Sequence, residues 1–215
     1  MNITPTSHPC IFVSHDEQDA HFPGEVESSL NRLRSGPSGN NLLDELRNFE
    51  SRNKRVTIER DNSDDPGARP CLTEKQQKKY GRDRVNDPSV TNTLITKSRN
   101  FLGIKKNGKG TSVTVKWSPN LGFKTDEEGM AQPDHSNPES AFVILGHELI
   151  HAKHMMQGTH KGLSGHKYAA GTPAAKEEWR AIGLGKYEGR ETSEYSICDE
   201  HGITRRSAYP GFNDP

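Results

Sequence analysis

Apolar residues recur at helical spacing in two short segments near the N-terminus. Residues 24–34 place three apolar side chains on one face of a helix, namely Val26, Leu30 and Leu33. Residues 41–51 repeat the arrangement with four, namely Leu42, Leu43, Leu46 and Phe49. The Ser-Gly-Pro-Ser-Gly run at 35–39 has turn chemistry. The pattern predicts two amphipathic helices joined by a turn.

Two other segments alternate between polar and apolar side chains, as half-buried strands do. Residues 55–60 read Arg-Val-Thr-Ile-Glu-Arg, and residues 111–117 read Thr-Ser-Val-Thr-Val-Lys-Trp before a turn at 118–120. β-Branched residues fit a pleated backbone, so we expect both segments to be strands. Residues 61–92 are dominated by polar residues and proline without a period, and no element is assigned to them.

The strongest helix signal covers residues 138–157. Asn137 suits the N-cap, Pro138 suits the first helical position, and Glu139 complements the positive end of the helix. Gly158 suits the position that terminates the helix. A helix that is apolar nearly all round is buried, and this one carries Phe142, Val143, Ile144, Leu145, Leu149, Ile150 and Met155.

The chain is poor in core-forming residues but balanced in charge. Leu, Ile, Val and Phe make up 38 of 215 residues, below the roughly 20 % at which disorder becomes common. The 29 basic and 29 acidic residues cancel, whereas disordered chains usually carry a high net charge. We therefore expect a small core with long polar loops. We expect a disordered segment over residues 1–23 and a single domain over residues 24–215.

Charge and cysteine content argue against several classes of protein. Nucleic-acid and membrane-surface proteins usually need a basic face, so neither a nucleic acid nor a membrane is expected as a partner. No run approaches 18 apolar residues, and residues 1–9 lack the features of a Sec signal peptide. Cys10, Cys71 and Cys198 lie far apart with no CxxC pair, which fits a reducing compartment.

The buried helix carries the charged sequence His147–Glu148–Leu149–Ile150–His151. Residues four apart lie one above the other on a helix, so both imidazoles can face one zinc ion. Glu148 projects beside that ion, where it can take a proton from a metal-bound water and pass it to the leaving amine. The alternative is a hydrogen-bonded pair of core histidines, which would leave costly polar groups without partners. The pattern favours one zinc ion per chain.

A catalytic zinc needs a third protein ligand. His154 and Gln157 stand where a metzincin would have Gly and His, so that class is excluded. A helix predicted from a Thr172 cap to a Gly183 stop offers Glu177 and Glu178. Glu178 is flanked on the helix by an apolar stripe of Ala174, Ala175, Ala181 and Ile182. A carboxylate in such a stripe needs a partner, so Glu178 is preferred and Glu177 stays open.

Three further histidines, His154, His160 and His166, could also reach a metal in principle. His154 lies about one turn beyond His151 and is too far along the helix axis to share the ion. His160 and His166 fall in a Gly-rich loop, where lining the cleft or facing solvent is the simpler role.

Arg206 and Tyr209 lie three residues apart near the C-terminus, beyond a short helix expected to end near Gly202. Peptide hydrolysis builds negative charge on the former carbonyl oxygen, and an arginine or a tyrosine hydroxyl aimed there would stabilise it. From spacing alone, a surface arginine and a packing tyrosine explain the pair equally well.

At these residues the chain resembles the NleD-like zinc metalloprotease effectors that Gram-negative pathogens deliver by type III secretion, including the HopH and XopG type of plant pathogens. The resemblance is strongest over residues 141–209. It covers Gly-His-Glu-Leu-Ile-His-Ala at 146–152, Lys-Glu-Glu-Trp-Arg-Ala-Ile-Gly-Leu at 176–184, Ser-Glu-Tyr-Ser-Ile at 193–197 and the Arg206–Tyr209 pair.

The resemblance implies a compact α+β, gluzincin-like zincin domain with a small antiparallel sheet packed on the HExxH helix. It also implies that residues 1–23 are an export segment, that the chain enters the host cell, and that it acts in the host cytoplasm. In animal pathogens, relatives cut mitogen-activated protein kinases in the activation loop, so a host signalling kinase is a candidate substrate. The family resembles clostridial neurotoxin light chains in its Arg–Tyr pair, which favours Arg206 and Tyr209 as catalytic residues.

Three functions remain in view. The leading one is a monomeric zinc endopeptidase that cleaves an extended host segment, which strand 111–117 could hold by strand addition if it forms the sheet edge. The second is an effector that binds and sequesters a host protein without catalysis, although such a binder has no need of Glu148. The third is a bacterial peptidase with no role in a host.

Overall fold

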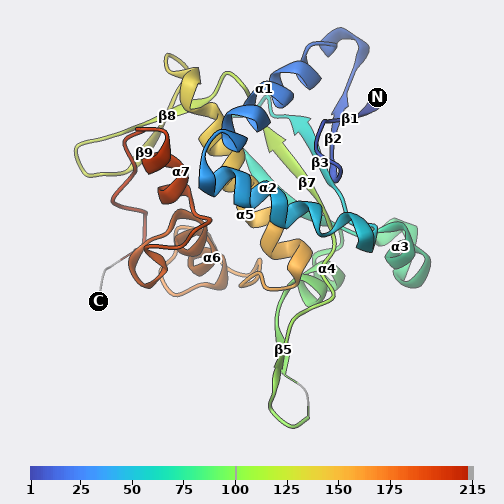
Figure 1. The fold of residues 1–215 in the computed structure, drawn as a ribbon. Coiled ribbons are helices and arrows are strands. Elements are labelled where there is room, and N and C mark those ends of the chain that lie inside the picture. The colour runs from blue at the N-terminus through green and yellow to red at the C-terminus, as the bar shows by residue number, and fades with distance from the viewer. Residues whose placement is uncertain (100, 213–215) are drawn as a thin grey trace.

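A five-stranded mixed sheet forms the centre of the computed structural model, which describes residues 1–99 and 101–212 (Figure 1). Across the sheet the strand order is β1-β2-β3-β7-β4. The inner pairs β2–β3 and β3–β7 are parallel, and the outer pairs β1–β2 and β7–β4 are antiparallel. The strands span Asn2–Pro5 (β1), Ile11–His15 (β2), Val56–Arg60 (β3), Gly67–Cys71 (β4) and Ser112–Trp117 (β7).

The expected α+β class is confirmed, but the sheet is mixed rather than antiparallel throughout. Parallel pairing follows from the connections, because the two helices between β2 and β3 carry the chain back to the starting edge of the sheet. Strand 111–117 does not meet the condition for strand addition, which was that it forms the sheet edge. β7 is paired on both sides, and β4 is the strand at that edge.

The expected disorder over residues 1–23 is also wrong. Ile11 and Val13 are fully buried in β2, and β1 pairs with β2 from Asn2 to Pro5. The apolar run at 11–13 is too short to stand out in a polar segment, yet its burial depends on β3, some 45 residues later. The export role of these residues stays a prediction.

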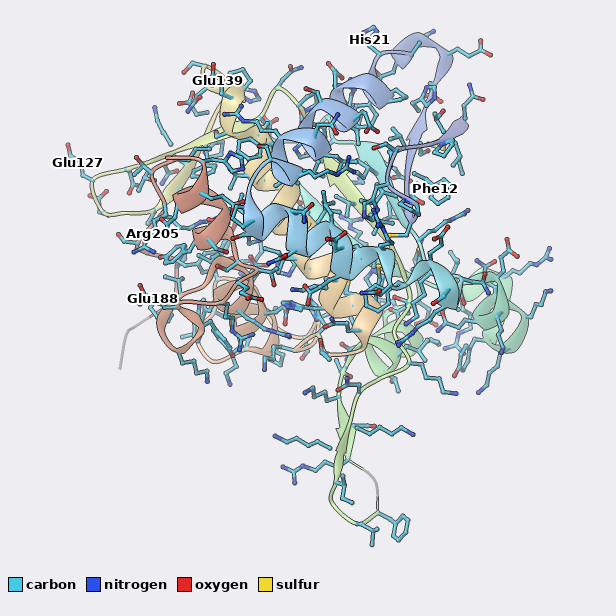
Figure 2. The ribbon with its side chains drawn as sticks, in the orientation of Figure 1. Phe12, His21, Glu127, Glu139, Glu188 and Arg205 are labelled. Atoms are coloured by element: carbon cyan, nitrogen blue, oxygen red, sulfur yellow. The ribbon has the colours of Figure 1, made fainter. Side chains whose placement is uncertain are left out.

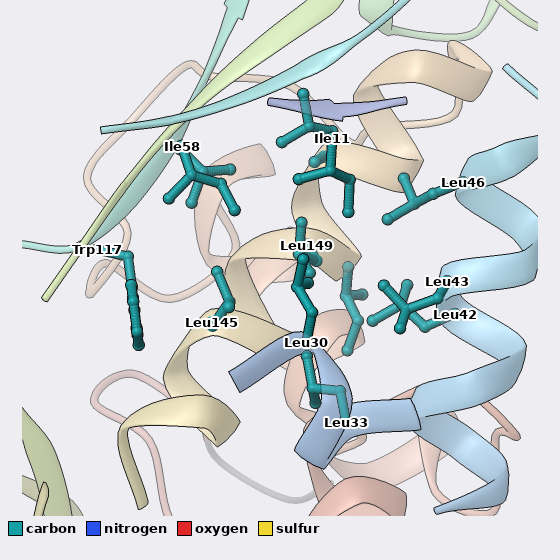
Figure 3. Packing of buried hydrophobic residues seen from close by; sticks show 14 of the residues in the cluster. Ile11, Leu30, Leu33, Leu42, Leu43, Leu46, Ile58, Trp117, Leu145 and Leu149 are labelled. Atoms are coloured by element: carbon teal, nitrogen blue, oxygen red, sulfur yellow. The ribbon is translucent and has the colours of Figure 1, made fainter. Parts of the chain in front are cut away.

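Three helices build the core against one face of the sheet (Figure 3). They are α1 (Phe22–Arg34), α2 (Pro37–Arg47) and α5 (Ala141–Gln157). Figure 3 shows Leu145 and Leu149 of α5 between the sheet residue Ile58 and the helix residues Leu30 and Leu42. All five side chains are buried completely. The core of this apolar-poor chain is therefore concentrated around the helix that carries the HExxH sequence.

Helix α2 begins inside the segment that was expected to be a turn. Backbone N–H groups of Ser38 and Gly39 donate to the carboxylate of Glu200, at 2.7 and 3.1 Å. An acidic side chain at the positive end of a helix stabilises it. This carboxylate lies 161 and 162 residues along the chain from the two donors, so local sequence could not indicate it. Pro37, at the first position of α2, was the local signal for the start of the helix.

Helix α5 is fixed at both ends. Trp117, the last residue of β7, donates from its indole Nε1 to the carbonyl oxygen of Ala141 at 2.8 Å. At the other end Gly158 adopts the left-handed conformation, as its position predicted. A Cβ atom there would lie 2.1 Å from the carbonyl oxygen of Gly108, so only glycine fits. These contacts fix the depth and rotation of the HExxH helix.

The remaining elements surround this core. Residues 61–92, which the pattern left unassigned, contain β4 and most of two short helices. The other helices are α3 (Glu74–Tyr80), α4 (Pro88–Ile95), α6 (Pro173–Ile182) and α7 (Glu194–Glu200). Two hairpins are β5–β6 (Ser98–Arg99, Lys105–Lys106) and β8–β9 (Gly122–Thr125, Ala131–Asp134). Single 3-10 turns are Glu17–Asp19, Glu50–Arg52, Arg82–Arg84, Pro138–Ser140 and Gly185–Tyr187. No helix of the described chain has the length and apolar content to cross a bilayer.

Candidate active site

Helix α5 holds His147 and His151 on one face with their rings close together. Nε2 of His147 lies 3.0 Å from Nε2 of His151, and the ring centroids are 4.6 Å apart. Both side chains, and that of Glu148 between them, are buried. Gly146 lets the helix sit deep, because a Cβ there would lie 2.9 Å from Ile197 Cδ1 and 3.0 Å from Leu33 Cδ2.

Helix α6 brings Glu178 to these two rings. Its Oε2 lies 3.3 Å from Nε2 of His147, and its Oε1 lies 3.4 Å from Nε2 of His151. The helix begins and ends as its sequence predicted, with a hydrogen bond from the Ala175 N–H to the Thr172 hydroxyl. The structure thus places Glu178, and not Glu177, beside the Nε2 atoms of both histidines.

The three side chains fit a zinc site. Their candidate ligand atoms all lie within 4.8 Å of one another. Donors at the corners of a tetrahedron about 2.0–2.1 Å from a zinc ion lie roughly 3.3 Å apart. The two Nε2 atoms, 3.0 Å apart, are close to that edge length. Each oxygen of Glu178 lies at about the same distance from one ring, Oε2 at 3.3 Å from His147 and Oε1 at 3.4 Å from His151. Two imidazoles and one carboxylate are also a common protein ligand set for catalytic zinc.

Glu177 faces the opposite side of the metal-site histidines. Its Oε1 accepts from His154 Nδ1 at 2.5 Å and lies 3.8 Å from Nδ1 of His151. Its Oε2 accepts from the backbone N–H of Lys161 at 2.9 Å, with Arg180 Nη1 at 3.6 Å. Burial opposes its ionisation, but His154 and His151 outweigh burial and hold the pKa of Glu177 well below its usual range. Glu177 is therefore a buried anion behind His151.

A second carboxylate, Glu194, stands behind His147. Its Oε2 lies 2.7 Å from Nδ1 of His147. Arg206 donates to both of its oxygens, from Nε and Nη2, each at 2.6 Å. Burial opposes ionisation of Glu194, but the Arg206 charge and His147 lower its pKa to about 2. Each histidine thus has an anion near its Nδ1, and the one at His147 lies within hydrogen-bonding distance. In metal sites a carboxylate bonded to the second ring nitrogen fixes the orientation of the ring.

All six predicted site residues line one cleft of about 540 Å³, namely His147, Glu148, His151, Glu178, Arg206 and Tyr209. β4 and the β8–β9 hairpin form one side of it, and residues 160–168 form another. His160 and His166 line it as well, as their loop position suggested. His154 does not, because it is buried against Glu177.

Burial also affects the groups that could transfer protons or donate hydrogen bonds. It raises the pKa of Glu148, which favours a carboxyl group that can hold a proton and release it. It raises the pKa of Tyr209 above its ordinary value, so the phenol stays protonated as a hydrogen-bond donor. Arg206 lines the cleft, but both described hydrogen bonds of its guanidinium go to Glu194. Its geometry fits a positioning residue for His147.

Glu194 had no role predicted from its sequence position. In the first turn of a capped helix, with Ser193 as the cap, an acidic residue has an ordinary explanation as a partner of the helix dipole. A buried carboxylate that faces a ring of another helix leaves no local sequence signal. The Glu177–His154 pair was also missed. It joins two helices and leaves no local sequence signal, and both residues had been considered as metal ligands only.

Comparison with known families decides the class of protein. The sequence model of the peptidase M91 family, described as effector proteins, matches residues 11–209. The chain belongs to this family. The family is one of peptidases, and the grouping of His147, His151 and Glu178 in the cleft fits a zinc metalloprotease. No curated protein matches the M91 chain.

Solved structures with a similar fold are Clostridium botulinum neurotoxin domains. The catalytic domain of serotype F is 14% identical and gives a TM-score of 0.44, covering 90% of this chain and 52% of that one. The serotype F light chain is 13% identical, with a TM-score of 0.43 and coverage of 87% and 50%. The serotype HA light chain is 14% identical, with a TM-score of 0.40 and coverage of 84% and 48%. The M91 chain spans about half the length of these domains, and no residue role is taken from them.

Proposed function

We propose that this M91 peptidase is a bacterial effector that enters a host cell by type III secretion and cleaves a host signalling protein there. The observation that supports the proposal is the convergence of His147, His151 and Glu178, with Glu148 beside them, in an open cleft of a chain from an effector family. One zinc ion per chain, a monomeric state and action in the host cytoplasm are parts of this proposal.

His147, His151 and Glu178 would hold the zinc ion. When bound, the ion supplies Lewis acidity that polarises a water and the carbonyl of the scissile bond. Glu148 then accepts the proton of the attacking water and gives it to the leaving amine. Tyr209 donates from its hydroxyl toward the charge that develops on the carbonyl oxygen. Arg206 supports His147 through Glu194.

The substrate would lie extended along the sheet edge at β4. Residues Pro66–Gly67–Ala68–Arg69 line the cleft, and β4 has a sheet partner on one side only. An extended peptide can add to such an edge by backbone hydrogen bonds. This replaces the earlier expectation for β7. The candidate substrate is a mitogen-activated protein kinase, on the resemblance to the NleD-like effectors of animal pathogens, and the HopH and XopG type of plant pathogens is the proposed subgroup.

Zinc content per chain tests the metal site first. Protein purified without added metal should hold about one zinc, measured by elemental mass spectrometry. His147→Ala should lose it, while His135→Ala, at an exposed histidine outside the cleft, should retain it. A folded wild-type protein that holds no zinc, and takes up none when zinc is added, would contradict the proposal.

Glu148→Ala separates cleavage from sequestration. Expressed in host cells, this variant should lose the effect of the wild-type chain and leave host proteins uncut, because only catalysis requires the general base. A sequestering effector would keep its full effect. Wild-type and variant abundance and zinc content are compared in the same cells, so that loss of folding is recognised.

A further inference from the structure

The β5–β6 hairpin extends from the body of the molecule as a separate arm (Figures 1 and 2). Its described residues from 97 to 107 are all exposed. Near its tip, the side chains of Phe101, Leu102 and Ile104 are 95%, 66% and 59% exposed. In Figure 2 the drawn side chains of the arm point away from it. Three large apolar side chains gathered at an exposed tip are typical of a binding surface.

The arm is also the centre of a basic stretch in a chain of zero net charge. Its cations flank the apolar tip on both strands, at Lys97, Arg99, Lys105, Lys106 and Lys109. No acidic residue occurs between Asp87 and Asp126. The described arm therefore has no acidic side chain of its own to pair with these cations. Apolar anchors bordered by cations complement an acidic surface with an apolar pocket.

The base of the arm is fixed to the wall of the active-site cleft. Gly108 donates from its N–H to the carbonyl oxygen of Gly158 at 2.8 Å, directly beyond helix α5. On the other strand, the backbone of Thr96 forms a bridge with His160, which lines the cleft. Just before the arm, Asn92 Oδ1 accepts from the N–H of Leu163, another cleft residue, at 3.1 Å. Both strands of the arm therefore begin beside residues that line or adjoin the cleft.

We propose that this arm, residues 97–109, is a docking element for the folded protein substrate. It would bind an acidic surface of that substrate that borders an apolar pocket, at a distance from the scissile bond. The inference rests on the proposed proteolytic function and extends it to how the substrate is chosen. The cleft then needs to hold only a short extended segment, and the arm supplies the specificity that a short segment lacks.

An anionic membrane has the same charge and apolar chemistry as such a protein surface. The attachment of the arm favours a protein partner. Both of its strands join segments that adjoin the cleft, so the arm is held in a fixed relation to the scissile bond. A membrane anchor gains nothing from that relation, whereas a substrate-docking element depends on it.

Two arm variants and one matched control test the inference. One variant replaces the anchors (Phe101→Ser, Leu102→Ser, Ile104→Ser), and the other reverses two charges (Lys105→Glu, Lys106→Glu). The control makes the same charge reversal at exposed lysines of α3 (Lys78→Glu, Lys79→Glu). Each zinc-loaded protein is incubated with native host-cell lysate and with a peptide library made from that lysate. Mass spectrometry of new N-termini gives the cleavage rate at each site in both forms.

The expected result is that the arm variants cut native proteins about 10- to 100-fold more slowly, while cutting the matching peptides within twofold of wild type. The control should match wild type in both assays. Equal cleavage of native proteins by wild type and arm variants would overturn the docking role alone. Wild-type protein that cuts neither lysate nor peptides would instead overturn the proposed function, and the docking role with it.

The same proteins are mixed with vesicles of phosphatidylcholine containing phosphatidylserine and then sedimented. If the arm docks to a protein, the wild-type chain should bind these vesicles no more than the arm variants do. Binding to vesicles that the arm variants lose, together with unchanged cleavage of native proteins, would make the arm a membrane element and overturn the inference.

Discussion

The surroundings of His147 and the β5–β6 arm depart from the usual distribution of residues in opposite directions. Around His147, ionisable side chains that normally face water are buried, and three carboxylates there have basic partners, as Glu194 has in Arg206. On the arm, large apolar side chains that normally lie in a core face solvent, as Phe101 does. Both departures cost stability in the isolated chain, so both point to function rather than to folding.

The two regions also differ in how firmly they are held. The buried region is fixed by α5, α6 and α7 together, and each metal-site histidine has an anion behind it. The arm is held at its base by backbone hydrogen bonds to residues next to the cleft. A rigid site with a protruding exposed element suits an enzyme that performs one reaction on a target chosen elsewhere on its surface.

The largest expected effect comes from Glu148→Gln, which removes the general base while keeping the volume of the side chain. The value of kcat/KM for a peptide substrate should fall by about 10²- to 10⁴-fold. The melting temperature and zinc content should match those of Glu127→Gln, a control at an exposed position. An enzyme that keeps most of its activity after this change would exclude Glu148 from proton transfer.

The contrast between a buried and an exposed leucine gives the next largest effect. Leu149→Ala should lower the free energy of unfolding by about 2–5 kcal/mol, because it leaves a cavity in the core beneath the site. Leu102→Ala on the arm should change it by less than about 0.5 kcal/mol. Urea unfolding monitored by circular dichroism measures both. A comparable loss in the arm variant would mean that its tip contributes to folding.

Within the buried region, Glu177→Gln and Glu178→Gln separate a supporting group from a ligand. Removing the anion behind His151 should weaken zinc binding by about 10- to 100-fold. Glu178→Gln should weaken it further, because the ion then loses one of three protein ligands. Competition with a chromophoric chelator gives both affinities. If Glu177→Gln proved the more damaging change, the third ligand would have to be reassigned.

The last expected effect is a pH dependence of stability that arises beside the candidate metal site. Burial lowers the pKa of His160 to about 4, and its Nδ1 accepts a hydrogen bond from the N–H of Gly162 at 3.0 Å. The ordinary pKa of a histidine is about 6.5. Between pH 6.5 and pH 4, His160 therefore takes up a proton in the unfolded chain but stays neutral in the folded chain. Stability is therefore lost as pH falls through that window, by about 1.4 kcal/mol per pH unit.

His160→Gln should remove this slope, and the difference between variant and wild type isolates it from other titrating groups. Urea unfolding at pH 7, 6 and 5 gives the two curves. Parallel curves would show that His160 is protonated in the folded state or does not titrate over this range.

Local signals in the sequence predicted the parts of the fold that are locally determined. Helix 138–157 carried its own start and stop signals, and the structure begins a 3-10 turn at Pro138 and ends α5 at Gln157. The predicted Asn137 cap is wrong, because its side chain makes no cap hydrogen bond. Strand 55–60 was found within one residue, because alternation with β-branched residues needs no partner to be seen. The first predicted helix, 24–34, begins two residues earlier than expected.

Errors arose where distant residues decide the outcome. The N-terminal strands depend on pairing with β3, and the start of α2 depends on Glu200. Zero net charge concealed the basic arm, because acidic residues elsewhere cancel it in the sum. For the site, helical spacing brought His147 and His151 together without any tertiary information. The groups behind them come from other helices and had no signature.

The contacts made by helix α7 and the residues after it matter for a chain that is still incomplete. Glu194 and Arg206 orient His147, and Glu200 of the same helix holds the start of α2. A chain that has not yet packed this segment carries both histidines but lacks the anion that aims the first. A chain that ends before residue 194 would therefore lack both the anion behind His147 and the carboxylate that holds the start of α2.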